Sequence, residues 1–204
     1  MNAVLKIRNL AKQFRLHLQG GVRIPVFDDL HLELAEGEAL AVTGPSGKGK
    51  SSLLKLIYGT YKAGQGEDWL DLARAEPRQV LEARRRTIGY VTQFLRVIPR
   101  VPALDIVAEP LLERGVAPEQ ARERAAQLLE RLNIPERLWS LSPMTFSGGE
   151  QQRVNIARGF AAAYPVLLLD EPTASLDQEN KARVLAMIDE ARAQGAGIIG
   201  IFHD

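Results

Sequence analysis

The chain has 204 residues, 46% of them hydrophobic and 25% charged, which is enough for one α/β domain with a small helical insertion. Its formal net charge of +1 lacks the basic excess of an electrostatic nucleic-acid binder, so no nucleic-acid partner is expected. No run approaches the roughly 18 apolar residues of a membrane span, and cysteine is absent, which excludes disulfides and thiolate metal sites. The N-terminus also lacks the apolar core of a signal peptide, so we expect a cytoplasmic protein without direct membrane insertion.

Strands and helices are predicted to alternate along most of the chain. The residues from Leu30 alternate between apolar and polar, as in a half-buried strand, and short apolar runs predict the other strands. In chain order the expected strands are 30–35, 39–43, 88–91, 166–170 and 197–202, and the expected helices are 51–59, one from about Glu150 and one from about Gln178. This alternation favours a mostly parallel sheet covered on both faces.

The middle of the chain has a different, helical pattern. Five apolar residues fall on one face of a predicted helix: Ala121, Ala125, Leu128, Leu129 and Leu132. Pro118 stands at the expected first helical position, and Pro135 lies just beyond the expected end. We therefore predict an α/β core made of residues 1–98 and 146–204, with residues 99–145 inserted as a helical subdomain.

A phosphate-binding loop is predicted between the second strand and the first helix. Residues 44–51 read GPSGKGKS, the G-x-x-x-x-G-K-[ST] pattern in its required strand-to-helix context. Its glycines let backbone N–H groups point at phosphate oxygens, and the helix adds its positive N-terminal end. The candidate nucleotide-binding residues of this loop are Gly44, Ser46, Gly47, Lys48, Gly49, Lys50, Ser51 and Ser52. A glycine-rich turn without a ligand is the alternative, but it does not explain a Lys-Ser pair at this place.

Two acids end the apolar strand VLLLDE, residues 166–171. In a phosphoryl-transfer site the first acid, Asp170, belongs to the Mg²⁺ shell together with the Ser51 hydroxyl. Glu171 lies one residue further, where it could take a proton from an attacking water. Solvated acids at a strand end are the alternative, which the nearby phosphate loop disfavours.

A second anion-binding motif lies in TFSGGEQQR, residues 145–153. Ser147, Gly148 and Gly149 precede a helix start, so they form a second cradle for phosphate oxygens. One triphosphate cannot easily use two cradles of the same chain. We therefore predict that each chain caps the ATP of a second chain, either an identical copy or a sister ATPase, in a head-to-tail pair.

The SGGEQQR motif resembles the signature of ABC ATPases, usually seen as LSGGQQQR. Other family elements follow in the family's order: Phe14 resembles the residue that stacks on adenine, and Gln93 the glutamine near the metal. Residues 174–177 resemble the loop that crosses the dimer interface, and His203 the histidine that senses the γ-phosphate. The resemblance implies a P-loop NTPase fold, an ABC-type nucleotide-binding domain that uses ATP and Mg²⁺, with Glu171 and His203 as catalytic residues.

A finer resemblance rests on segments outside the catalytic motifs. They are QFLRVIPR (93–100), NIPERLW (133–139) and TFSGGEQQRVNIARGF (145–160), with GEDWLDL (66–72) and GIFHD (200–204). Together they resemble the L subunit of bacterial carbon–phosphorus lyase systems. That resemblance implies soluble lyase subunits as partners, and support for forming α-D-ribose 1-methylphosphonate 5-triphosphate from ATP and a phosphonate. The alternatives are the ATP-binding subunit of a transporter, of importer or lipoprotein-release type, and a nucleotide-gated assembly factor.

Two departures from the family pattern qualify these expectations. Lys48 stands where the family usually has a small residue, so it either strengthens triphosphate binding or points to solvent. The sequence stops at Asp204, just after His203, and we expect the C-terminal part of the fold to follow.

Overall fold

The computed structural model describes residues 2–16, 22–59, 65–67, 75–95 and 99–202. The strands are β1 (Ala3–Leu16), β2 (Val22–Ala35), β3 (Ala39–Ala41), β4 (Gln65–Glu67), β5 (Ile88–Val91), β6 (Val166–Asp170) and β7 (Gly197–Ile201). The helices are α1 (Lys50–Ile57), α2 (Pro77–Arg86), α3 (Ala103–Leu112), α4 (Pro118–Arg131), α5 (Glu136–Trp139), α6 (Gly148–Gly159) and α7 (Gln178–Ala193), with a 3₁₀ turn, η1, at Pro143–Thr145.

A four-stranded parallel sheet forms the centre of the molecule, in the order β3-β7-β6-β5. Every residue of β6 and of β7 is buried, as expected for strands covered on both faces. The register places Tyr90 opposite Leu168 and Asp170 opposite Ile201. The predicted parallel sheet is confirmed, and its carboxyl edge gathers the ends of β5, β6 and β7.

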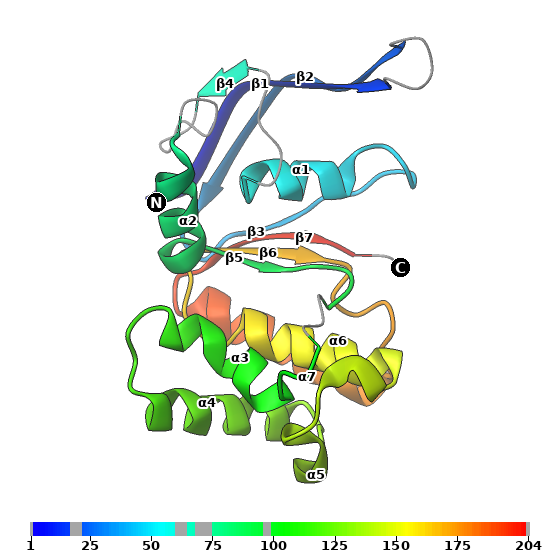
Figure 1. Cartoon of the computed structure of the whole chain (residues 1–204). Helices are drawn as coiled ribbons and strands as arrows, with labels where there is room; N and C mark the ends of the chain where they lie inside the picture. Colours follow the sequence, from blue (N-terminus) through cyan, green and yellow to red (C-terminus); the bar gives the residue numbers. More distant parts are fainter. Residues whose placement is uncertain (1, 17–21, 60–64, 68–74, 96–98, 203–204) are drawn as a thin grey trace.

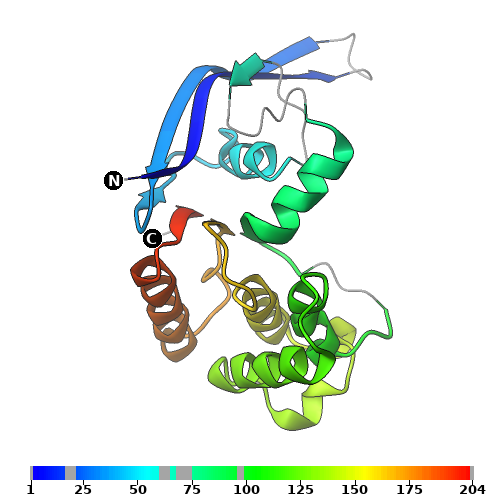
Figure 2. The same cartoon turned by 90° about the vertical axis from the view of Figure 1, so that its left-hand side faces the viewer.

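The sequence pattern revealed only part of a second, antiparallel sheet, ordered β2-β1-β4. The strand expected at 30–35 is the last part of β2, which pairs with β1 in a long hairpin. Register shifts interrupt this pairing, and Asn9 and Asp29 have positive φ angles of 50° and 58°. These irregularities break the period of two, so the sequence pattern does not show the full strands. Figures 1 and 2 show α1 between this hairpin and the parallel sheet.

The opposite face of the parallel sheet is covered by α6 and α7, with α3 beside α6, and α4 and α5 lie farther from the sheet (Figures 1 and 2). As predicted, α4 begins at Pro118 and buries Ala121, Ala125, Leu128 and Leu129. Their hydrophobic cluster also includes residues of β6 and β7, so the helical region shares a core with the sheet. The limits of the inserted subdomain, 99 and 145, stay a prediction. Within the described ranges no helix is long and apolar enough to cross a membrane.

Candidate functional site

The phosphate loop joins β3 to α1 and has an unusual backbone. Gly44, Gly47 and Gly49 adopt φ angles of 134°, 78° and 90°, which side chains other than hydrogen rarely allow. A Cβ atom at Gly44 or Gly47 would meet no atom within 4 Å, so the loop surrounds open space there. At Gly49, by contrast, a Cβ would clash with the Val26 side chain of β2. The loop is thus open toward a ligand and closely backed by the hairpin.

The other predicted residues of the loop lie where a triphosphate could reach them. The Lys50 ammonium donates to the carbonyl oxygens of Gly44 and Pro45 at 2.6 and 3.1 Å, so it lies across the loop. Ser46 and Lys48 are exposed, and Ser52 is half-buried in the first turn of α1. The loop therefore presents one lysine aligned with its backbone and a second lysine, Lys48, on its outer surface.

Asp170 brings the phosphate loop and the sheet together at a polar centre. Its carboxylate is buried, with 3% of the residue exposed, and it accepts a hydrogen bond from the Ser51 hydroxyl at 3.1 Å. The Tyr90 hydroxyl of β5 donates to the second carboxylate oxygen, also at 3.1 Å. A hydroxyl and a carboxylate at the start of a phosphate-binding helix are the hard oxygen ligands that Mg²⁺ prefers. The residues present therefore fit the predicted metal.

Glu171 and Gln93 meet beside this centre. The Gln93 amide donates to a Glu171 carboxylate oxygen at 2.9 Å, and the two residues come from the ends of β6 and β5. Glu171 has a positive φ of 52°, which costs roughly 1–2 kcal/mol for a residue with a Cβ. Its N–H donates to the Ile201 carbonyl at 3.0 Å, which anchors this turn to β7. The backbone thus directs Glu171 away from the path of β6, and Gln93 holds its carboxylate.

The second predicted cradle begins α6, on the other side of the sheet from α1 (Figure 1). Ser147 and Glu150 form a capping box: the Ser147 hydroxyl accepts from the Glu150 N–H, and the Glu150 carboxylate accepts from the Ser147 N–H. The Ser147 hydroxyl also donates to Glu150 at 2.6 Å, and these bonds hold the pKa of Glu150 below its usual value. A Cβ on Gly149 would lie 3.4 Å from the Ser175 carbonyl, so this cradle adjoins the 174–177 loop.

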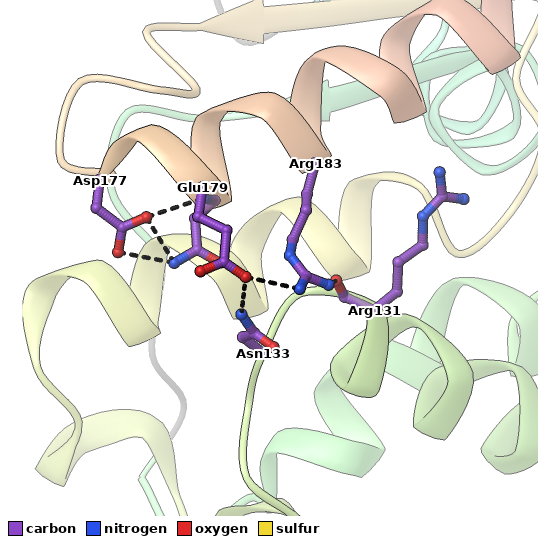
Figure 3. Close-up of polar contacts among 6 residues, drawn as sticks. Arg131, Asn133, Asp177, Glu179 and Arg183 are labelled. Carbon is purple, nitrogen blue, oxygen red and sulfur yellow. Dashed lines mark hydrogen bonds and ion pairs between the residues drawn. The ribbon is translucent and has the colours of Figure 1, made fainter.

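The 174–177 loop ends in the cap of α7, and the first turns of α7 are bonded to the end of α4 and the residue after it (Figure 3). The Asp177 carboxylate caps α7 by accepting from the Asn180 N–H at 2.8 Å, which lowers the pKa of Asp177. Glu179, in the first turn, accepts from Asn133 at 3.3 Å and from Arg183 at 2.8 Å. The 174–177 loop is therefore connected to the helical region through α7.

The structure brings together two groups of the predicted residues. One group is the phosphate loop with Ser51, Asp170, Gln93 and Glu171; the other is Ser147–Gly149 with the 174–177 loop. Phe14 lies in β1, but its side chain falls outside the described part of the chain, and so does all of His203. Sequence reasoning did not single out Tyr90, whose contact with Asp170 depends on strand register.

Comparison with known families settles the class. The family model described as "ABC transporter" matches residues 27–174. The chain belongs to the ABC transporter family. It is 41% identical to the lipoprotein-releasing system ATP-binding protein LolD of Maricaulis maris, over 93% of this chain and 84% of that protein. It is 34% identical to the macrolide export ATP-binding/permease protein MacB of Bartonella henselae, over 100% of this chain but only 31% of MacB.

A solved structure agrees with the whole fold of this ABC ATPase domain. The dimeric, post-hydrolysis state of the ATP-binding cassette MJ0796 bound to ADP and Pi has a TM-score of 0.90 and 31% identity. The match covers 98% of this chain and 88% of MJ0796. The predicted P-loop NTPase fold of ABC type is confirmed.

The finer resemblance to the carbon–phosphorus lyase L subunit is contradicted. The similar proteins LolD and MacB are lipoprotein-release and export ATP-binding proteins, and neither is named as a phosphonate subunit. The prediction of soluble lyase partners and of a role in phosphonate chemistry is therefore wrong. One of the segments that suggested them, residues 145–160, contains the signature motif and the start of α6, which any member of the family would share.

Replacing Lys48 by serine should change nucleotide affinity only modestly. Lys48 is exposed, so water and salt screen the attraction of its charge for a triphosphate. We expect ATP to bind Lys48→Ser within about fivefold of the parent, as measured by calorimetry, because an exposed ion pair contributes at most about 1 kcal/mol. A loss as large as that expected for Lys50→Ala would instead place Lys48 on the phosphates.

Proposed function

We propose that this chain is the ATP-binding subunit of a membrane transporter of the lipoprotein-release or a related export type. In this proposal it binds and hydrolyses MgATP in a head-to-tail pair and works at the cytoplasmic face of a permease. The names of its relatives supply the transporter class, and the geometry of the chain supports the chemistry.

The single observation that carries the proposal is the presence of two phosphate cradles on opposite faces of one sheet. The α1 cradle has the lysine, the Ser51 hydroxyl and the Asp170 carboxylate, whereas the α6 cradle has only helix N–H groups and the Ser147 hydroxyl. The α6 cradle could therefore contact the phosphates of a nucleotide bound elsewhere, but it lacks the lysine and the carboxylate needed to bind MgATP by itself. A second copy, turned head to tail, would bring one cradle of each kind to each ATP.

The residues divide the work of hydrolysis by their positions. Lys50 and the loop N–H groups would hold the phosphates, Ser51 and Asp170 would hold Mg²⁺, and Glu171 would orient a water molecule and take its proton. Mg²⁺, when bound, would neutralise charge on the phosphates. The Gln93 amide, which donates to Glu171, links the carboxylate to the segment that leads into α3.

Exposed apolar side chains favour a permease contact near the same segment. Phe94 is 75% exposed, directly after Gln93, and Met144 and Leu141 are 58% and 47% exposed. The Ala103 N–H donates to the Leu141 carbonyl at 2.9 Å, so the segment after β5 and the segment before α6 are joined there. In this proposal these exposed apolar side chains form part of the surface that contacts the permease.

A single-cysteine cross-link tests the permease contact directly. Residues 1–204 contain no cysteine, so Phe94→Cys introduces the only thiol of this part of the protein. With a thiol-reactive photo-cross-linker on the complete protein in its native membranes, we expect Phe94→Cys to form an adduct with an integral membrane protein. Leu185→Cys, an exposed apolar position on α7, serves as the matched control and should give no such adduct. Adducts of Phe94→Cys with soluble proteins alone would contradict the transporter assignment.

A further inference from the structure

Asp170 is fixed by two side chains from different elements. Ser51 at the start of α1 donates to one carboxylate oxygen, and Tyr90 on β5 donates to the other. The strand register explains the second contact: Tyr90 is opposite Leu168, and Asp170 lies two residues further along β6, on the same face of the sheet. That face is the one covered by α1, because Leu168 and Tyr90 pack with the buried leucines of α1.

The two donors differ in what they can do when a nucleotide arrives. Ser51 is a predicted Mg²⁺ ligand, so its hydroxyl oxygen would bind the metal through a lone pair while its proton could still be donated to Asp170. Tyr90 is not a predicted metal ligand; its hydroxyl donates to Asp170, and its ring packs against a second aromatic ring. Its ring centroid lies 5.1 Å from that of Tyr58, the residue that ends α1.

The side chain of Arg84 also contacts Tyr58. The Arg84 guanidinium of α2 stacks over the Tyr58 ring at 4.7 Å and donates to the Tyr58 carbonyl at 2.9 Å. A line of contacts therefore runs from α2 through Tyr58 and Tyr90 to the Asp170 carboxylate. Each contact has a defined geometry, so the Tyr90 hydroxyl has little freedom to leave Asp170.

We propose that Tyr90 is a positioning residue for magnesium binding, whose hydroxyl holds one oxygen of Asp170 so that the other faces the metal site. The inference rests on the proposed function, because it requires MgATP at the α1 cradle. A buried carboxylate with one oxygen fixed by a hydroxyl cannot rotate freely between metal-facing and sheet-facing positions. Without that hydroxyl, part of the metal-binding free energy is spent on ordering Asp170.

The test is Tyr90→Phe, which removes the hydroxyl and keeps the ring against Tyr58. Binding of a non-hydrolysable, fluorescent ATP analogue is followed while Mg²⁺ is titrated, and again in excess chelator. We expect the Mg²⁺ concentration for half-maximal binding to rise about tenfold, the typical effect of losing a hydrogen bond to a charged group. Binding in chelator should stay within about twofold of the parent, because the phosphate loop itself is unchanged.

Tyr58→Phe is the matched control, because it makes the same chemical change in the neighbouring ring. We expect it to keep the Mg²⁺ midpoint of the parent. An unchanged midpoint in Tyr90→Phe overturns the inference, and so does an equal loss of binding in chelator, which would show a general structural role. If the parent itself binds no analogue with Mg²⁺, the proposed function fails and the inference fails with it.

Discussion

Replacing Lys50 by alanine is expected to abolish ATP binding. The ammonium lies across the phosphate loop, 2.6 Å from the Gly44 carbonyl, and is the loop's one basic group aligned with its backbone in the described structure. A charge-assisted hydrogen bond to phosphate contributes about 1.5–3 kcal/mol, and we expect the lysine to reach more than one phosphate oxygen. We therefore expect calorimetry to show a loss of affinity of at least about a hundredfold.

The control for this prediction is another lysine on the same helix. Lys55 stands in the last turn of α1, away from the loop, and Lys55→Ala should bind ATP like the parent. Thermal unfolding of both variants should remain close to that of the parent, because neither lysine is buried in the core. Equal affinity of Lys50→Ala and the parent for ATP would refute the phosphate-loop assignment.

The parts of the site that consist of consecutive residues could be predicted from the sequence. The GPSGKGKS loop and the helix start at Ser147–Gly149 depend on neighbours within a few positions, and the structure shows both as local backbone features. Asp170 lies at the end of its strand as predicted, because a fully apolar run with an acid after it defines that end.

The contacts between distant segments could not be predicted in this way. Tyr90 and Asp170 are 80 positions apart, and Gln93 and Glu171 are 78 apart. Each pair meets only because β5 and β6 are adjacent in one register, which no local pattern specifies. The positive φ of Glu171 likewise follows from its bond to Ile201 of β7.

The helix α2 could not be predicted from the sequence for a different reason. Only three of its ten residues are apolar, Val80, Leu81 and Ala83, which is too few to establish a helical period in the sequence, and none of its residues is buried. The arginine run of its last turn is typical of a solvated face; Arg85 and Arg86 are indeed exposed, but Arg84 stacks on Tyr58. Arg114 also donates to the Arg85 carbonyl at 2.8 Å, so tertiary contacts stabilise the end of this helix.

Replacing Glu171 by glutamine is expected to stop ATP hydrolysis while leaving ATP bound. Glutamine has the same shape, and its carbonyl oxygen can still accept from the Gln93 amide, so the turn after β6 should be preserved. The change removes the carboxylate that we propose takes a proton from water, and such a group contributes about 10²–10⁴-fold to the rate. With ATP and Mg²⁺ present, the variant should therefore accumulate as a closed pair.

Two measurements on the complete protein separate the parts of this prediction. Phosphate release should fall at least about a hundredfold for Glu171→Gln, whereas Glu123→Gln, an exposed carboxylate of α4, should hydrolyse ATP like the parent. Light scattering should show the mass of a dimer for Glu171→Gln only when ATP and Mg²⁺ are both present. Undiminished phosphate release would remove Glu171 from the chemistry. A monomer under all conditions would mean that the α6 cradle does not close over the ATP of a second copy, because the trapped state is the one in which both cradles hold the same nucleotide.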